Sequence, residues 1–396
     1  MELITNNKCS PDIFVKFVST KPPTENDRTH ETVILPSSPD LPPLPMGRTS
    51  CDFASTGKTP PESVYTNPIY TRNSNTSITY HEGLYYYLQD TPGKLVLYVS
   101  DDPTDFDGKE RHEICDVRAE YKLYHYWHPQ IVNIDGVWYI YFAADDGNTD
   151  NHQLYVLTNP SADPTRGQFR MKGHISTDPQ NNWAIHAHVF PYEGNWYMLW
   201  SGWETRRIFA ETQCLYIARM KNPWTLATER VLISKPEYEW ECQWINPDGS
   251  TRIAYPLMVN ESPFFFCNAA TDKAYIYYSA SASWTPYYSI GELSAPKGSD
   301  LLDPSVWTKR PTPVLAQNRE AEIYGPGYPF IIPSPDSTEY YLIYMARSNE
   351  INMYGNTSYG VYMQKIDFDD KGAPQIGTAV SRDVPLPKPS GIHKNK

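Results

Sequence analysis

The sequence has few cysteines, no surplus of basic residues and no long apolar run. Its 6 Cys are scattered among 396 residues without C-x-x-C spacing, which fits neither a zinc site nor a dense disulfide framework. No run approaches the roughly 20 apolar residues that a membrane helix needs. The formal net charge of -12 argues against nucleic acid and against an anionic membrane surface as partners.

The first twenty residues contain no basic segment followed by a continuous apolar one, so we predict no signal peptide. Three N-x-S/T patterns begin at Asn75, Asn260 and Asn356. A glycan on Asn260 would block the neighbouring Glu261. We therefore expect a cytoplasmic location.

Aromatic residues and proline are abundant, with 31 Tyr, 11 Trp and 36 Pro. Aromatic side chains suit pleated strands, and proline interrupts helices, so the composition favours an all-β fold. Tyrosine and tryptophan serve equally in a packed β core and in a surface that binds sugar rings. Composition alone does not separate these two uses.

The prolines concentrate in residues 1–64, among Ser and Thr and without periodicity. We predict a largely irregular arm there, with polyproline II character. The segment PDLPPLP (39–45) is compatible with an SH3-type ligand, although a packing arm or linker explains it as well. We expect residues 381–396 to form a flexible basic tail.

A turn followed by an aromatic-rich alternating strand recurs between these two ends. The copies are HEGLYYYL (81–88), DGVWYIYFA (135–143), EGNWYMLWS (193–201), DKAYIYYSAS (272–281) and STEYYLIYMA (337–346). Five copies predict a five-bladed β-propeller over residues 65–380, because radial repetition protects strand edges.

The stretch LMVNESPFFF (257–266) places one carboxylate, Glu261, in a run that otherwise reads as a buried strand. Such a group is paired, protonated or used in chemistry, unless it points to solvent at the rim. Polar residues precede the other hairpins at the same place in the repeat. We therefore expect Asn75, His128, His186, Glu261 and Tyr328 to meet at the mouth of the central channel.

The segments WHPQIVNIDGVWYIYFAADDGNTDNH, NNWAIHAHVF, NESP and YGPGY resemble, in this order, glycoside hydrolase family 43, the arabinofuranosidase and xylosidase propellers. The resemblance spans roughly residues 67–346. It implies glycoside hydrolysis with inversion, in which an Asp of blade one activates water and a Glu of blade four protonates the leaving oxygen. An Asp of blade three raises the pKa of that Glu.

Only some of the catalytic residues that the resemblance implies have a matching residue in this sequence. Glu261 matches the general acid, but Asn75 stands at the position of the base and His186 at that of the blade-three Asp. Tyr328 replaces a His that often lies near a metal, which puts a calcium ion at the channel centre in doubt, so we predict no cofactor. A protonated His186 would lower the pKa of Glu261, and Tyr328 could then donate a proton.

Further residues are candidates for substrate contacts. His128 and His188 could carry protons, and Trp127, Trp203 and Trp284 could stack on a sugar ring or pack in the core. Residues 145–150, DDGNTD, have the composition of a calcium loop without EF-hand spacing, which favours an ordinary hairpin loop.

Three functions remain open at this point. The first is a glycosidase of the arabinofuranosidase type with an unusual base, acting on a small-molecule or oligosaccharide substrate. The second is a repurposed propeller that carries out proton transfer, such as elimination, isomerisation or cyclisation, in a biosynthetic pathway. The third is a non-catalytic sugar-binding module. The sequence does not indicate an oligomeric state.

Overall fold

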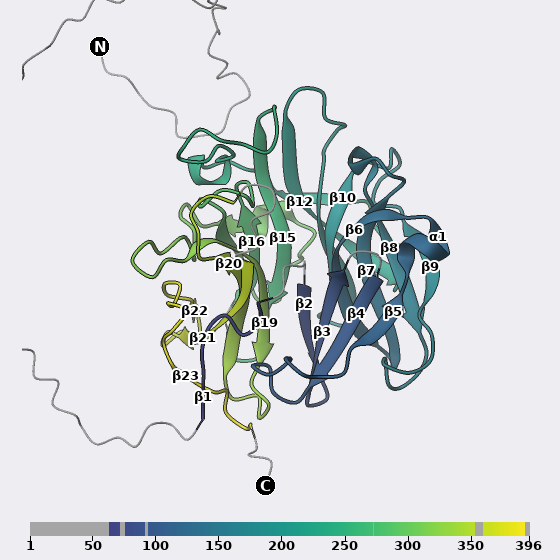
Figure 1. The fold of residues 1–396 in the computed structure, drawn as a ribbon. Helices are drawn as coiled ribbons and strands as arrows, with labels where there is room; N and C mark the ends of the chain where they lie inside the picture. Colours follow the sequence, from purple (N-terminus) through teal and green to yellow (C-terminus); the bar gives the residue numbers. More distant parts are fainter. Residues whose placement is uncertain (1–62, 72–75, 92–93, 272, 353–358, 393–396) are drawn as a thin grey trace, which may run out of the picture. The chain divides into compact units, whose positions relative to one another are not determined.

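The computed structural model describes residues 63–392, apart from 72–75, 92–93, 272 and 353–358 (Figure 1). The predicted irregular arm over 1–64 lies outside the described residues except for 63–64. No helix in the described part is long and apolar enough to cross a bilayer. The one α-helix there, α1 (Val117–Tyr121), begins where the Asp116 side chain accepts from the Ala119 N–H.

The described strands form the five blades of a β-propeller, as predicted, each built around antiparallel strands (Figure 1). Blade one contains β2 (Thr76–His81), β3 (Leu84–Thr91), β4 (Lys94–Ser100) and β5 (His112–Cys115). Blade two contains β6 (Tyr124–Ile134), β7 (Val137–Asp145), β8 (Gln153–Asn159) and β9 (Arg170–Ile175). Blade three contains β10 (Ala184–Tyr192), β11 (Asn195–Gly202), β12 (Glu211–Asn222), β13 (Thr225–Leu226) and β14 (Val231–Ser234).

Blade four contains β15 (Leu257–Phe266), β16 (Lys273–Ala280), β17 (Ser289–Pro296) and β18 (Thr308–Lys309). Blade five contains β19 (Tyr324–Pro333), β20 (Tyr340–Arg347), β21 (Tyr359–Phe368) and β22 (Pro374–Gln375). Three 3-10 turns lie in the connections: η1 (Thr149–Asn151), η2 (Glu239–Glu241) and η3 (Pro304–Val306). The start of β12 also pairs in parallel with β15, which joins blades three and four.

The recurring hairpins correspond to the first two strands of each blade. In blade two the turn is Asp135-Gly136, and both residues have positive φ, 53° and 81°. This is the backbone that a two-residue hairpin turn matching the strand twist requires, which explains the acidic residue followed by Gly. The same pair, Glu193-Gly194, joins β10 to β11.

Five apolar clusters fill the spaces between neighbouring blades, one for each pair including blades five and one. Alternate residues of each strand enter the cluster on either side, because strand side chains alternate between the two faces of a sheet. This accounts for strands such as β7 and β16, which are apolar on both faces. Burial on both sides holds each blade against its neighbours.

The ring is closed by residues that precede blade one. Ile69 N–H donates to Val361 O of β21, and Val361 N–H donates to Tyr70 O, both at 2.8 Å. The Asn67 side chain bonds the backbone of Met363 in both directions, with Nδ2 donating at 2.9 Å and Oδ1 accepting at 2.8 Å. Residues from the two ends of the propeller thus lie side by side in blade five.

The segment expected to be a flexible tail differs from that expectation over residues 381–392. There β23 (Leu386–Pro387) pairs with β1 (Val64–Tyr65), and Lys388 Nζ donates to Asp102 Oδ2 at 2.6 Å. Strand pairing and an ion pair hold these residues against the propeller, which the basic composition did not indicate.

Candidate active site

Four of the innermost strands carry a β-bulge at the same place. The pairing with the second strand is interrupted in β6, β10, β15 and β19, and one residue in each gap has positive φ. These residues are His128 (51°), His186 (57°), Ser262 (50°) and Tyr328 (56°). A bulge re-aims a side chain, and positive φ in a non-glycine residue is uncommon enough to mark a site.

Three of the bulge residues meet at one point. The rings of His128 and His186 lie 3.5 Å apart between centroids, and Tyr328 stacks on His128 at 4.7 Å. Tyr328 also meets the edge of His186 at 5.6 Å. The structure therefore brings together side chains from blades two, three and five, as the repeat predicted.

Asn75, the predicted blade-one member, lies outside the described residues. In the sequence it precedes the Glu82-Gly83 turn by the same number of residues as His128 and His186 precede theirs.

Glu261 precedes the bulge residue of blade four and is 7% exposed. Its Oε1 accepts a hydrogen bond of 2.6 Å from the hydroxyl of Tyr288, and its Oε2 lies 3.9 Å from His186 Nδ1. Burial raises the pKa of Glu261 to about 7, the Tyr288 hydrogen bond opposes this, and the charge of Glu211 adds to it. The carboxyl therefore holds its proton to a higher pH than an ordinary glutamate does.

The sequence predicted a protonated His186 that lowers the pKa of Glu261, and this prediction is wrong. Burial, together with nearby His128 and His152, lowers the pKa of His186 well below its usual range, so the ring is neutral at pH 7. Burial likewise lowers the pKa of His128. Both nitrogens of each ring lack a hydrogen-bond partner among the described residues. The loss of water around His186 therefore affects its pKa more than the attraction to Glu261 that we expected from the sequence.

A pocket of about 510 Å³ opens above Glu261. His128, Ile185, Glu261 and Tyr328 belong to its lining, and we call these four residues the floor. The walls include the three predicted tryptophans, Trp127, Trp203 and Trp284, together with Trp183 and Tyr255. Such a pocket, aromatic with a few polar groups, suits one small ring.

His188 does not line this pocket. Its Nδ1 accepts from Gln130 Nε2 at 3.0 Å, and its ring packs against Phe190 and Phe264. Burial lowers its pKa to about 3. His188 thus lies on the same strand as His186 but packs in the interior below the floor.

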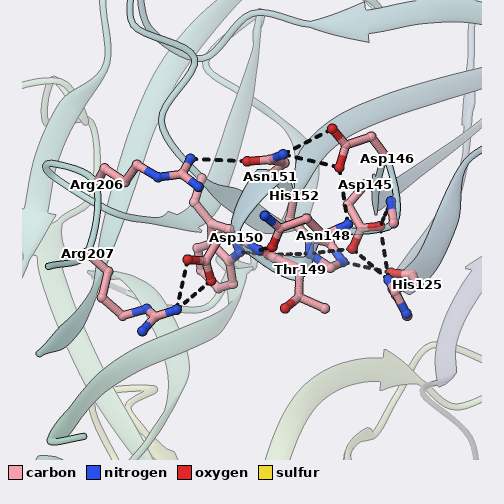
Figure 2. Close-up of polar contacts among 12 residues, drawn as sticks. His125, Asp145, Asp146, Asn148, Thr149, Asp150, Asn151, His152, Arg206 and Arg207 are labelled. Atoms are coloured by element: carbon pink, nitrogen blue, oxygen red, sulfur yellow. Dashed lines mark hydrogen bonds and ion pairs between the residues drawn. The ribbon is translucent and has the colours of Figure 1, made fainter. Parts of the chain in front are cut away.

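The pocket mouth contains charged residues that the sequence did not single out. Arg207 Nη2 donates to both oxygens of Asp150, at 2.6 and 2.8 Å (Figure 2). Its guanidinium lies 4.1 Å from the ring centroid of Tyr255, and its Nε lies 3.8 Å from Glu211. Asp150, Glu211 and Tyr255 all line the pocket. Asp150 and Tyr255 are far from Arg207 in the sequence, so no local motif marked these contacts.

Residues 146–152 form the loop between β7 and β8, which follows Asp145 at the end of β7. The carboxylates of this region accept hydrogen bonds from nearby side chains (Figure 2). Asp145, buried, accepts from His125 Nδ1 at 2.9 Å and lies 3.2 Å from His152 Nδ1. Asp146 accepts from Asn151. No group of three or more His, Cys, Asp or Glu within the described residues has the arrangement of a metal site. The carboxylates of Asp145 and Asp146 thus accept from donors of the protein itself.

This loop also supports one wall of the pocket. The ring of His152 stacks on Trp127 at 3.9 Å between centroids. Its two nitrogens lie 2.8 Å from Thr149 O and 2.7 Å from His125 O. The indole N–H of Trp183 donates to the same Thr149 carbonyl at 2.9 Å. The loop therefore fixes two tryptophans that face the pocket.

Known proteins resemble the chain over this whole region. The family model for glycosyl hydrolases family 43 matches residues 65–374. An extracellular exo-alpha-(1->5)-L-arabinofuranosidase of Streptomyces chartreusis is 28% identical over 81% of this chain and 97% of its own length. A protein of the same description from Streptomyces avermitilis is 29% identical over 83% of this chain and 66% of its own length. The solved alpha-L-arabinofuranosidase of Lactobacillus brevis superposes with a TM-score of 0.72 at 26% identity, covering 81% of this chain and 98% of that one.

Proposed function

Since this chain belongs to glycosyl hydrolases family 43, we propose that it hydrolyses a terminal arabinofuranoside or similar pentoside, with Glu261 as the general acid. The observation that carries the proposal is the buried Glu261 in the pocket floor, with its pKa raised to about 7. A general acid must hold its proton at the working pH, and burial provides this. The names of the related arabinofuranosidases support the choice of sugar.

The Tyr288 hydrogen bond decides which oxygen of Glu261 carries the proton. Because Tyr288 donates to Oε1, the proton of the neutral carboxyl resides on Oε2. In the reaction the glycosidic C–O bond breaks and this proton passes to the leaving oxygen. Glu261 becomes a carboxylate that Tyr288 then stabilises.

We propose His128 as the group that accepts a proton from the attacking water. It shares the floor with Glu261, and its ring is neutral with both nitrogens unpaired among the described residues. The water oxygen bonds the anomeric carbon while its proton passes to His128. A neutral imidazole accepts a proton, although its lowered pKa makes it a weak base.

Leaving-group dependence tests both roles. Glu261→Gln should lose about 10²–10⁴ of kcat/KM on an arabino-oligosaccharide but much less on an aryl arabinofuranoside whose leaving group needs no proton. His128→Gln should lose activity on both substrates equally. Glu193→Gln, in an exposed turn, serves as the control. Failure of the wild-type protein to hydrolyse any pentoside in a broad panel would overturn the proposal.

Proton transfer on a non-sugar substrate is a second candidate, favoured by one observation. Glu261 is the single carboxylate of the floor, and neutral His128 and His186 lie beside Tyr328. Within the described floor, this set contains an acid and neutral imidazoles but no second carboxylate beside Glu261. Exchange of substrate C–H for deuterium in D2O, without release of sugar, would favour this candidate. Calorimetric binding of oligosaccharides without any turnover would instead indicate a sugar-binding module.

A further inference from the structure

Two buried serine hydroxyls contact two of the bulges in the innermost strands. The Oγ of Ser201 accepts a hydrogen bond of 3.1 Å from the backbone N–H of Ser262, and the Oγ of Ser279 accepts one of 2.8 Å from the backbone N–H of Tyr328. Both serines are 0% exposed. Neither serine lines the pocket, so any effect on the reaction must pass through another residue.

The two contacts occupy the same place in successive blades. Ser201 is the next-to-last residue of β11, the second strand of blade three, and Ser279 is the next-to-last residue of β16, the second strand of blade four. Each serine contacts the bulge residue of the blade that follows it, Ser262 in blade four and Tyr328 in blade five. A contact that recurs at one position of the repeat indicates a shared role in holding the bulge.

The bulge residues need such a contact because their backbone is strained. Ser262 and Tyr328 have φ of 50° and 56°, in the left-handed region, although neither is glycine. This conformation persists only where the surrounding structure determines it, and a buried N–H without an acceptor is itself unfavourable. The pairing of β15 with β16 is interrupted between Glu261 and Phe264, so the strand ladder does not hold Ser262. The Ser201 hydroxyl supplies a contact where the ladder has none.

We propose that Ser201 is a positioning residue for the general acid. By holding the Ser262 N–H, it fixes the backbone directly after Glu261, and the carboxyl then points at the leaving oxygen. This inference rests on the proposed function for the role of Glu261. A displacement of about 1 Å at a catalytic group costs up to about 10²-fold in rate, so a hydroxyl outside the pocket has a measurable effect.

Ser279 has the equivalent role for Tyr328. The Tyr328 ring stacks on His128, the proposed base, with 4.7 Å between the centroids. The two serines therefore act on different parts of the reaction: Ser201 on proton donation to the leaving group, and Ser279 on the activation of water. This difference predicts different responses to the leaving group.

Two substrates with the same sugar test the two serines separately: an arabinose disaccharide, and a 4-nitrophenyl arabinofuranoside, whose leaving group needs no proton. In Ser201→Ala we expect kcat for the disaccharide to fall about tenfold, because the acid is misdirected, while kcat for the aryl compound changes little. KM should stay unchanged, since the hydroxyl does not contact the substrate. In Ser279→Ala, kcat should fall by a similar factor on both substrates, because the proposed base serves both reactions.

Ser334→Ala is the matched control. Ser334 is also 0% exposed, and its Oγ also accepts from a backbone N–H, that of Glu339, at 3.0 Å. It lies directly after β19 and does not line the pocket, so the variant should lose stability but keep kcat on both substrates. Equal losses of kcat on the two substrates in Ser201→Ala, or no loss beyond that of Ser334→Ala, would overturn the proposal.

A titration without substrate separates this inference from the proposed hydrolysis. Carbon-13 at the glutamate carboxyls, with the signal of Glu261 assigned by its loss in Glu261→Gln, reports the pKa of Glu261 directly. If Ser262 moves, the 2.6 Å bond from Tyr288 to Glu261 weakens. The pKa of Glu261 should then rise in Ser201→Ala and stay at the wild-type value in Ser334→Ala. This rise in a protein that hydrolyses no pentoside would refute the hydrolysis and support the positioning role, whereas a wild-type pKa in Ser201→Ala would overturn that role.

Discussion

The hydroxyl of Tyr288 donates a hydrogen bond of 2.6 Å to Oε1 of Glu261 inside the buried floor of the pocket. The bond favours the ionised carboxylate, and burial favours the neutral acid. Burial has the larger effect, so the pKa of Glu261 lies near 7 rather than near its ordinary value. The hydrogen bond from Tyr288 therefore limits the rise in the pKa of Glu261.

Replacing this tyrosine should move the pH profile. In Tyr288→Phe the ionised form loses a hydrogen bond worth roughly 1.5–3 kcal/mol, so the pKa of Glu261 rises by about 1–2 units. Activity that requires the protonated acid then persists to higher pH, and the alkaline limb of kcat/KM moves upward. Tyr287→Phe, at the adjacent position, should keep the wild-type profile. A downward movement of the limb in Tyr288→Phe would contradict this account.

Glu261 should also make folding stability depend on pH. Its folded pKa of about 7 exceeds the ordinary 4.5, so the folded state binds the proton more tightly. Stability is fully present below about pH 4.5 and is lost as pH rises through 7, by about 3 kcal/mol in total. Urea titrations should therefore show that the free energy of unfolding of Glu261→Gln increases relative to that of the wild type between pH 5 and 8. A constant difference in the free energy of unfolding across this range would show that the pKa of Glu261 is not raised.

The fold was predictable because its signals are local and repeated. Acidic-Gly turns such as Asp135-Gly136 and Glu193-Gly194 specify hairpins within a few residues, and five hairpins specify the ring. The burial of Glu261 followed from its apolar neighbours on one strand. Such patterns need no knowledge of distant contacts.

The electrostatics of the site were not predictable in the same way. The direction of the Glu261 pKa depends on how far water is excluded, and that depends on blades packing together. Tyr288 and Arg207 contact residues 27 and 57 positions away, respectively. No short sequence motif therefore indicated either residue. His188 was misplaced because a bulge breaks the strand alternation between it and His186.

The buried carboxylate at the end of β7 should stabilise the pocket wall. Asp145 accepts from His125 and from the Gly147 N–H, and is 1% exposed, whereas the adjacent Asp146 is exposed. Asp145→Asn should lower the free energy of unfolding by about 1–3 kcal/mol, because buried donors lose a charged acceptor. Asp146→Asn should have a much smaller effect in the same urea titration. Equal effects would show that burial of Asp145 is unimportant.

Closure of the ring offers the last prediction. Asn67, 3% exposed, satisfies both the N–H and the C=O of Met363 in β21. Asn67→Ala leaves a buried backbone N–H without its acceptor and should lower the free energy of unfolding by about 1–3 kcal/mol. Asn195→Ala removes an exposed turn bond to Glu193 O and should change little. Because neither Asn67 nor Met363 lines the pocket, KM should stay at the wild-type value while the urea midpoint falls. If both variants unfolded at the same urea concentration as wild type, the Asn67 bonds would not be what closes the propeller.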